Sequence, residues 1–250
     1  MRDLDGPAAT LRGIDPRLVD LVEHLSATTL GGGLTEAVLT VARPSPLDEV
    51  DVVPHLRAVQ WFLDRAADGG IPLTGAGYLK PADVLEASTF VPVMADWIGK
   101  KNRENTCRPL LEFRKALQQV GLLRKNKDML LLTRAGEAAQ RDPGVLWEHL
   151  ADRLIPSSTA FKVHAALLLL AYTAASADRE LPFATITALL NNFGWRHEDG
   201  SPVVEVDVRW LPMWDILQNI TDQPVTFRRY DVVSPAAAAL ARRALRRATG

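Results

Sequence analysis

The chain has 250 residues, a formal net charge of −1, 47% hydrophobic residues and 24% charged residues. This composition is typical of a folded globular protein and excludes an intrinsically disordered chain. A near-neutral net charge argues against a protein that coats nucleic acid without selectivity. The single cysteine excludes an intramolecular disulfide and a cysteine-based metal site.

The first part of the chain, residues 1–54, is predicted to be an extension made of a helix and loops. Residues 1–16 contain acidic residues and no apolar core, so we do not expect a signal peptide. An Asp-Pro pair predicts the start of a short helix over 15–29. Residues 36–50 predict a strand or short helix that runs into a proline-rich loop.

Residues 55–155 carry the clearest pattern of helices and strands. Apolar residues recur at three- and four-residue spacing over 55–67, which predicts an amphipathic helix. A short strand at 71–74 and a helix at 81–88 follow. An insertion over 89–105 then separates these elements from the next helix.

A second amphipathic helix is predicted over 106–120, with Thr106 as its cap and a glycine just after its end. Two apolar runs within 122–133, separated by a Lys/Asn/Asp turn, predict a β-hairpin. Thr133 closes the second strand and is expected to cap the following helix with its side-chain oxygen. A further Asp-Pro pair starts a helix over 142–155.

The order helix, strand, helix, helix, strand, strand, helix over 55–141 is that of a winged helix-turn-helix. Residues 156–250 fit the same template, with a buried first helix at 159–176 and an alternating segment at 225–233 as a wing strand. The apolar run at 163–175 is shorter than the roughly 20 residues that cross a bilayer, so no membrane association is expected.

We therefore predict a mainly α protein with small β-hairpins, an α+β fold of tandem winged helix-turn-helix modules at 55–155 and 156–250. Its expected location is cytoplasmic. The tryptophans at helical spacing are expected in the core: Trp61, Trp147, Trp210 and Trp214.

Two stretches, "GIPLTGAGYLKPADV" and "LLEFRKALQQVGLLRKNKDMLLLTRAGEAAQRDPGVLWEHLADRL", carry a resemblance to a known group. They resemble a segment of uncharacterised actinobacterial proteins, some of them plasmid-encoded. The resemblance covers residues 56–155, with weaker support to residue 220. It implies a winged-helix fold and an actinobacterial source, and it implies no catalytic residue.

Basic residues gather between positions 100 and 127, where nine Lys or Arg stand against two Glu, a local charge of +7. Residues 178–222 are acidic instead, with three Arg against eight Asp or Glu. In a winged helix the third helix enters the major groove, where Arg and Gln read base edges, and the wing contacts phosphates. The candidate DNA contacts come from the insertion, the third helix and the wing: Lys100, Lys101, Arg103, Arg108, Arg114, Lys115, Gln118, Gln119, Arg124, Lys125 and Lys127.

The alternative for these residues is a solvated helix face beside a charged turn, since Lys and Arg populate most exposed surfaces. Glu112, in the middle of the same helix face, weakens the DNA interpretation. The arginine-rich segment 241–247 allows three interpretations: it caps its own helix, lies on DNA, or contacts an acidic partner.

No pattern points to an enzyme, a cofactor or a metal site. The five histidines lack metal-binding spacing, and Cys107 has no evident base or acid partner. The segment LTGAG at 73–77 lacks the Gly-Lys-Ser/Thr that completes a phosphate-binding loop.

Two functional hypotheses remain. The first is a regulator-like protein that binds double-stranded DNA with the third helix and wing of the first module. The second is a protein-interaction or assembly module that uses winged helices without touching DNA. In either case the acidic second module is a poor DNA reader and is expected to form a homodimer or to bind a protein partner.

Overall fold

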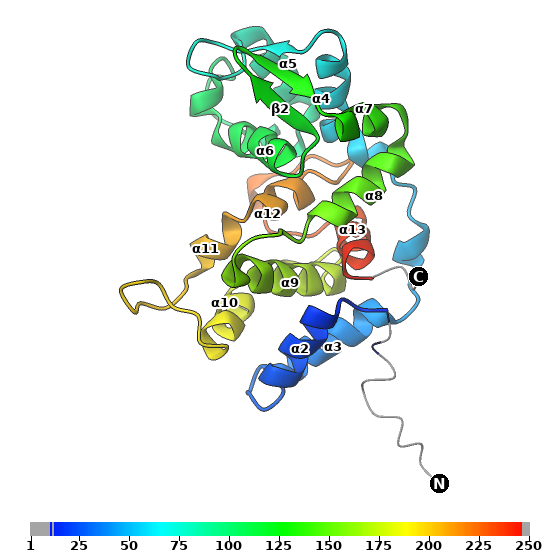
Figure 1. Cartoon of the computed structure of the whole chain (residues 1–250), viewed down its shortest axis with the longest axis vertical. Coiled ribbons are helices and arrows are strands. Elements are labelled where there is room, and N and C mark those ends of the chain that lie inside the picture. Colours follow the sequence, from blue (N-terminus) through cyan, green and yellow to red (C-terminus); the bar gives the residue numbers. More distant parts are fainter. Residues whose placement is uncertain (1–10, 12, 247–250) are drawn as a thin grey trace.

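The computed structural model describes residue 11 and residues 13–246, which form a mainly helical structure with a small three-stranded antiparallel sheet (Figure 1). The helices are α2 (Pro16–Leu25), α3 (Gly31–Ala42), α4 (Arg57–Ala67), α5 (Pro81–Phe90), α6 (Arg108–Gln119), α7 (Arg134–Arg141), α8 (Pro143–Arg153), α9 (Ala160–Ala175), α10 (Phe183–Asn192), α11 (Glu205–Arg209), α12 (Pro212–Leu217) and α13 (Pro235–Leu245). The strands are β1 (Ile71–Pro72), β2 (Leu123–Asn126) and β3 (Met129–Leu132). The interpretation of residues 1–10 as lacking a signal peptide lies outside the described residues.

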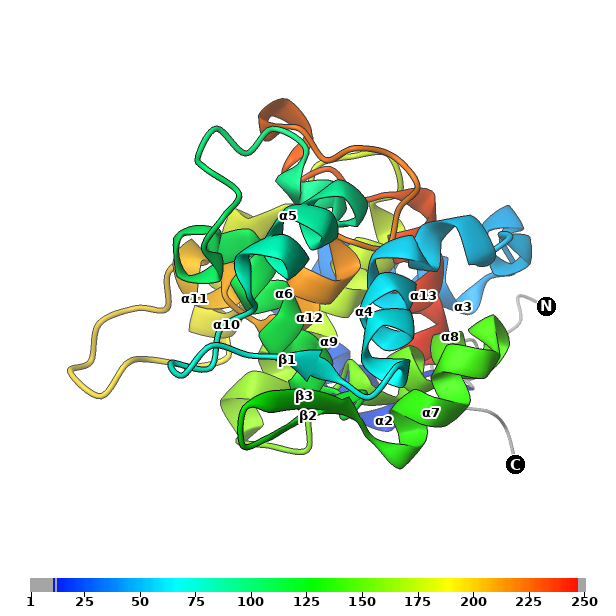
Figure 2. The same ribbon diagram turned by 90° about the horizontal axis from the view of Figure 1, so that it is seen from above.

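The order of elements expected over 55–141 is confirmed. The strands lie in the order β1–β3–β2, and both pairs are antiparallel, so the hairpin returns beside the short first strand. Within the hairpin, Leu123 pairs with Leu132 and Asn126 with Met129. Helices α4, α5 and α6 lie together on one side of these strands (Figure 2).

The turn from β3 into α7 depends on Thr133. Its hydroxyl accepts a hydrogen bond from the Gly136 N–H at 3.0 Å and donates to the Gly121 carbonyl at 2.5 Å, so the predicted cap is confirmed. Gly136 lies so close to the backbone of Leu122 that a Cβ atom would collide with it. The Thr-x-x-Gly sequence is therefore a packing device that seats α7 against the hairpin.

The prediction of a second wing, with a strand over 225–233, is wrong. Among the described residues of 156–246, the chain makes only isolated bridges, such as Ala177 with Val233, and Phe227–Arg229 form a 3₁₀-helix. The backbone N–H groups of Val225 and Phe227 bond to Pro92 and Asp96, respectively, in the preceding half of the chain. These backbone groups are satisfied by another segment, so no hairpin forms there.

Two short helices after residue 204 are separated at Pro212. Residues before it form α11, and Pro212 itself opens α12, because proline lacks the N–H that would continue a helix and fits the first turn of a new one. Trp214 on α12 is buried, as are Trp61 and Trp147. Trp210, between the two helices, is 62% exposed, so its expected place in the core is wrong.

One hydrophobic core connects elements from both ends of the described chain. Helix α9, whose residues 165–174 are all buried, packs against α3, α10 and α13, while α13 also packs against α8. Helix α12 packs against α6, which joins the two predicted modules. In the part of the chain that the structure describes, no helix has the length and apolar character needed to cross a membrane.

Candidate nucleic-acid interface

Helix α6 is the element expected to read DNA. Its apolar residues Leu110, Phe113 and Leu117 are buried, which fixes the helix against the first-module core. Gly121 follows it with a positive φ of 79°, as a helix-ending glycine should. The expected cap is wrong: Thr106 lies in a preceding 3₁₀ turn, and Cys107 precedes α6 without a capping side chain.

Arg114 does not face solvent and leaves the set of candidate DNA contacts. The residue is only 4% exposed. Its guanidinium donates to the Glu104 carboxylate at 2.5 Å and 3.0 Å and to the Gln118 amide oxygen at 2.7 Å. Glu104 is buried as well and accepts from the Leu79 N–H at 2.8 Å. The pair ties the insertion and the loop before α5 to α6, so Arg114 and Gln118 hold the fold together.

Helix α12 packs beside α6, while Arg108 and Lys115 on α6 stay exposed. The Arg108 guanidinium lies 4.6 Å from the ring centre of Trp210, in a cation–π contact. Lys115 pairs with Glu112 on the same helix at 3.1 Å. Both of these cations of α6 are therefore engaged in contacts within the protein, although water still reaches them.

A partly buried acid lies at the contact between α6 and α12. Burial, and then the neighbouring Glu112 carboxylate, raises the pKa of Asp215 on α12 to about 7, although Arg108 and Lys115 act in the opposite direction. The pKa of Tyr230 is also raised, first by burial and then by the Asp215 charge. Asp215 therefore changes its charge near neutral pH, at the contact between α6 and α12.

The insertion contributes two exposed cations. Lys100 and Arg103 face solvent, whereas the Lys101 ammonium is half-buried and donates to the Met94 carbonyl at 2.9 Å. Arg103 adjoins Glu104, whose carboxylate bonds to the Leu79 N–H, and Lys80, which follows Leu79, is exposed. Lys80 was missed in the sequence because it stands alone, outside the basic run.

The hairpin carries three exposed cations, Arg124, Lys125 and Lys127, which we call the wing cations. Lys127 occupies the turn with a positive φ of 55°, a conformation that an extended strand does not have. The Lys125 ammonium lies against Gly77 in the loop between β1 and α5. Lys125 of the wing and Glu104 of the insertion thus both contact the loop over residues 74–80.

Gln119, the last candidate on α6, is exposed at the end of the helix and lines a groove toward α9 and α12. It lies away from the hairpin strands that carry the wing cations. The candidate contacts therefore fall into three groups: residues that hold the fold, exposed residues of α6 beside α11 and α12, and exposed residues of the wing and insertion.

The other residues considered for chemistry have structural surroundings. Cys107 is buried, its thiol donates to the Lys100 carbonyl at 3.7 Å, and burial raises its pKa. His164 accepts from the Trp195 indole N–H at 3.2 Å, and burial lowers its pKa. Within the described ranges, no group of three or more His, Cys, Asp or Glu is placed to hold a metal ion.

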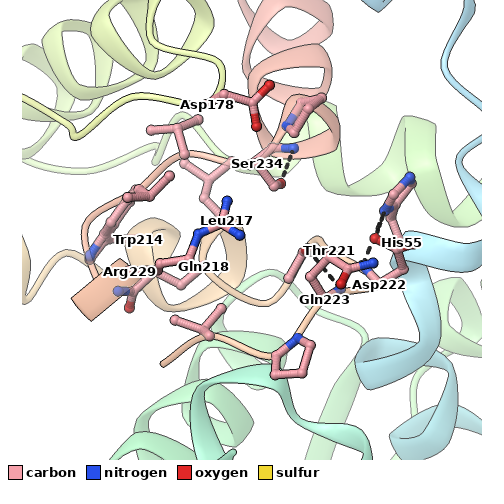
Figure 3. Close-up of a pocket in the computed structure, with 16 residues that line it drawn as sticks. His55, Asp178, Trp214, Leu217, Gln218, Thr221, Asp222, Gln223, Arg229 and Ser234 are labelled. Carbon is pink, nitrogen blue, oxygen red and sulfur yellow. Dashed lines mark hydrogen bonds and ion pairs between the residues drawn. The ribbon is translucent and has the colours of Figure 1, made fainter. Parts of the chain in front are cut away.

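A pocket lies where residues 214–237 meet the start of α4 (Figure 3). His55 accepts from the Asp222 N–H at 3.1 Å, and its ring nitrogen lies 3.5 Å from the Asp222 carboxylate. The cavity measures about 90 Å³, below the roughly 300 Å³ at which ligand pockets begin. It is a packing gap beside a contact that joins the two halves of the chain.

No protein-family model matches the chain, and the comparisons with curated proteins and with solved structures find no match either.

Proposed function

We propose that this chain is a winged-helix DNA-binding protein that contacts the sugar-phosphate backbone through its wing rather than through α6. The observation that carries the proposal is the group of exposed wing cations on a two-stranded hairpin. Lys100 and Arg103 add two exposed cations from the insertion, whose Glu104 bonds to Leu79 in the 74–80 loop. Cations on an exposed hairpin suit phosphate contacts, which position a protein on DNA without reading sequence.

The contacts that Arg108 and Arg114 of α6 already make within the protein determine the kind of DNA binding expected. Arg108 is stacked on Trp210 and Arg114 is paired with Glu104, so neither guanidinium is free to pair with guanine. Without base contacts, affinity comes from phosphate neutralisation and release of counterions. We therefore expect weak, salt-sensitive binding that depends little on DNA sequence.

The proposal is tested by fluorescence anisotropy with a labelled random duplex of about 24 base pairs, titrated between about 50 and 200 mM salt. The variant Lys125→Ala/Lys127→Ala is expected to weaken binding and to reduce the slope of log affinity against log salt by about 2, since each phosphate contact contributes about 0.9.

A matched control is Arg57→Ala/Arg141→Ala, which removes two exposed cations from another part of the surface. It is expected to keep the salt slope of the unchanged protein. The proposal fails if the unchanged protein shows no salt-dependent binding, or if the control loses as much affinity as the wing variant.

A protein-interaction function is the second candidate, and exposed apolar residues of the second half of the chain favour it. The large apolar side chains exposed there are Val204, Val206, Trp210, Phe227 and Tyr230. Such residues are enriched at protein interfaces when they gather in a patch. Sedimentation of the unchanged protein and of Trp210→Ala/Phe227→Ala would separate the candidates, because a homodimer built on this region becomes monomeric in the variant.

A further inference from the structure

A groove of about 580 Å³ lies where the two predicted modules meet. Its walls come from the end of α6, the connection between α8 and α9, the first turns of α9 and the start of α12. Its volume lies within the range of roughly 300 to 1,000 Å³ that is usual for small-molecule sites. No residue of this groove belongs to the wing.

The base of the groove is apolar. Val120, Leu154, Ala166 and Met213 line it, and all four are buried within the hydrophobic core. These side chains leave little surface open to water, and a ligand gains about 25 cal/mol for each Å² of that apolar area that it covers. The base therefore favours a hydrophobic or amphipathic molecule over a small inorganic ion.

The rim of the groove is cationic. Arg153 and Lys162 both line it, both are exposed, and neither makes an ion pair or side-chain hydrogen bond among the described residues. The hydroxyls of Ser157 and Ser158 stand between them in the chain. Asp152 is the one acid in the lining, and its charge acts on Arg243 of α13, which is already paired with Glu148.

We propose that this groove binds a small amphipathic anion, with its apolar body on the buried base and its carboxylate, sulfonate or phosphate between Arg153 and Lys162. Unpaired cations beside an apolar surface are complementary to that ligand class, because charge-assisted hydrogen bonds are stronger than neutral ones. The ligand would touch both α6, at Gln119, and α12, at Pro212, so its binding is linked to the contact between these two helices.

A second groove of the same volume provides an internal comparison. It lies between α4, α5 and the junction of α7 with α8, and it also measures about 580 Å³. Its charged groups are mixed in sign, and Arg65 is paired with Asp83 at 2.8 Å. Volume alone would give both grooves the same affinity for an anion, whereas charge favours the groove with Arg153 and Lys162.

The test uses two dyes of similar shape: the anionic anilinonaphthalene sulfonate and the neutral phenylnaphthylamine. In fluorescence titrations, Arg153→Ala/Lys162→Ala is expected to raise the dissociation constant of the sulfonate by roughly tenfold or more, since two charged hydrogen-bond donors are lost. Affinity for the neutral dye should stay within about twofold, because the apolar base is intact. A tryptophan at the rim, Ser157→Trp, should weaken both dyes by filling the groove.

The control is again Arg57→Ala/Arg141→Ala, which removes two cations from the second groove and should leave sulfonate affinity unchanged. Circular dichroism melting checks that the variants fold, as expected for substitutions of exposed residues. The proposal is overturned if Arg153→Ala/Lys162→Ala leaves sulfonate affinity unchanged, if the control weakens it equally, or if Ser157→Trp has no effect. None of these results depends on DNA binding, so the two proposals stand or fall separately.

Discussion

Arg242 is a charged side chain held almost entirely inside the protein, with 1% of its surface exposed. Its guanidinium bonds to the Asp48 carboxylate at 3.0 Å and to the carbonyls of Thr40 and Arg43 at 2.7 Å and 2.5 Å. These carbonyls lie at the end of α3, where helical hydrogen bonding runs out. Arg242 of α13 thus caps a helix that lies far earlier in the chain.

This arrangement gives the first prediction. Arg242→Ala leaves two backbone carbonyls and the Asp48 carboxylate without this partner, and it should lower the free energy of unfolding by about 3 kcal/mol. Urea unfolding measures this loss. Arg243→Ala, one residue away, removes an exposed pair with Glu148 and should cost about 1 kcal/mol or less. Equal losses for the two variants would contradict the capping role.

Residue roles were predictable where the partner is local. Thr133 was identifiable as a cap because its acceptor and donor lie within a few residues or across one hairpin. The role of Arg242 was not, because its partners are about 200 positions away in the sequence. Arg114 was misassigned for a related reason: helical spacing gives no sign that Glu104 folds back onto it. Arg247, the last arginine of this group, lies outside the described residues.

At the scale of elements, the contact between α6 and α12 contains an ionisable group with a pKa near neutrality. Asp215 faces Glu112, Arg108 and Lys115 on α6, and its charge also acts on Tyr230. Its ordinary value is 3.8 and its folded value about 7. The folded state therefore favours the protonated acid, and this contribution to stability is complete below about pH 4 and lost as the pH rises to about 7.

The second prediction uses Asp215→Asn, which fixes this side chain in a neutral form. The substitution should stabilise the protein by about 2–4 kcal/mol more at pH 8 than near pH 4, as judged by urea unfolding at both values. Asp128→Asn, in the exposed hairpin turn, is the control and should show no such difference. A pH-independent effect of Asp215→Asn would rule out a buried ionisation at this contact.

The elements themselves were predictable where the pattern was local and strong. The hairpin, α4 and α6 follow from apolar spacing and turn residues. The strand predicted over 225–233 is absent because backbone N–H groups of this segment bond to Pro92 and Asp96 instead of to a neighbouring strand. The contact between α6 and α12 was also not predictable, since the α6 pattern does not show which of its residues meet another helix.

At the scale of the whole molecule, the second half wraps back onto the first. Helix α12 lies on α6, α13 on α8, and α3 on α9 (Figure 1). One hydrophobic core connects these contacts. The predicted boundary at residue 156 therefore falls in a connection whose two sides share buried surface.

A shared core predicts cooperative unfolding. Calorimetry of the full chain should give one transition, with calorimetric and van't Hoff enthalpies that agree. Ile216→Ala, in α12, should shift that whole transition to lower temperature, at a cost of about 2–4 kcal/mol. Two resolved transitions, with only one moved by Ile216→Ala, would instead support independent modules at 55–155 and 156–250.

The burial of Cys107 has a practical consequence for spectroscopy. Its thiol is the only one in the sequence and is shielded from solvent, so a maleimide reagent finds no reactive native site in the folded protein. An introduced thiol, such as Lys127→Cys in the hairpin turn or Ser158→Cys at the groove, would carry a single dye at a known position. Energy transfer between that dye and a labelled duplex, or its response to an added anion, would report each proposed contact in an otherwise unmodified background.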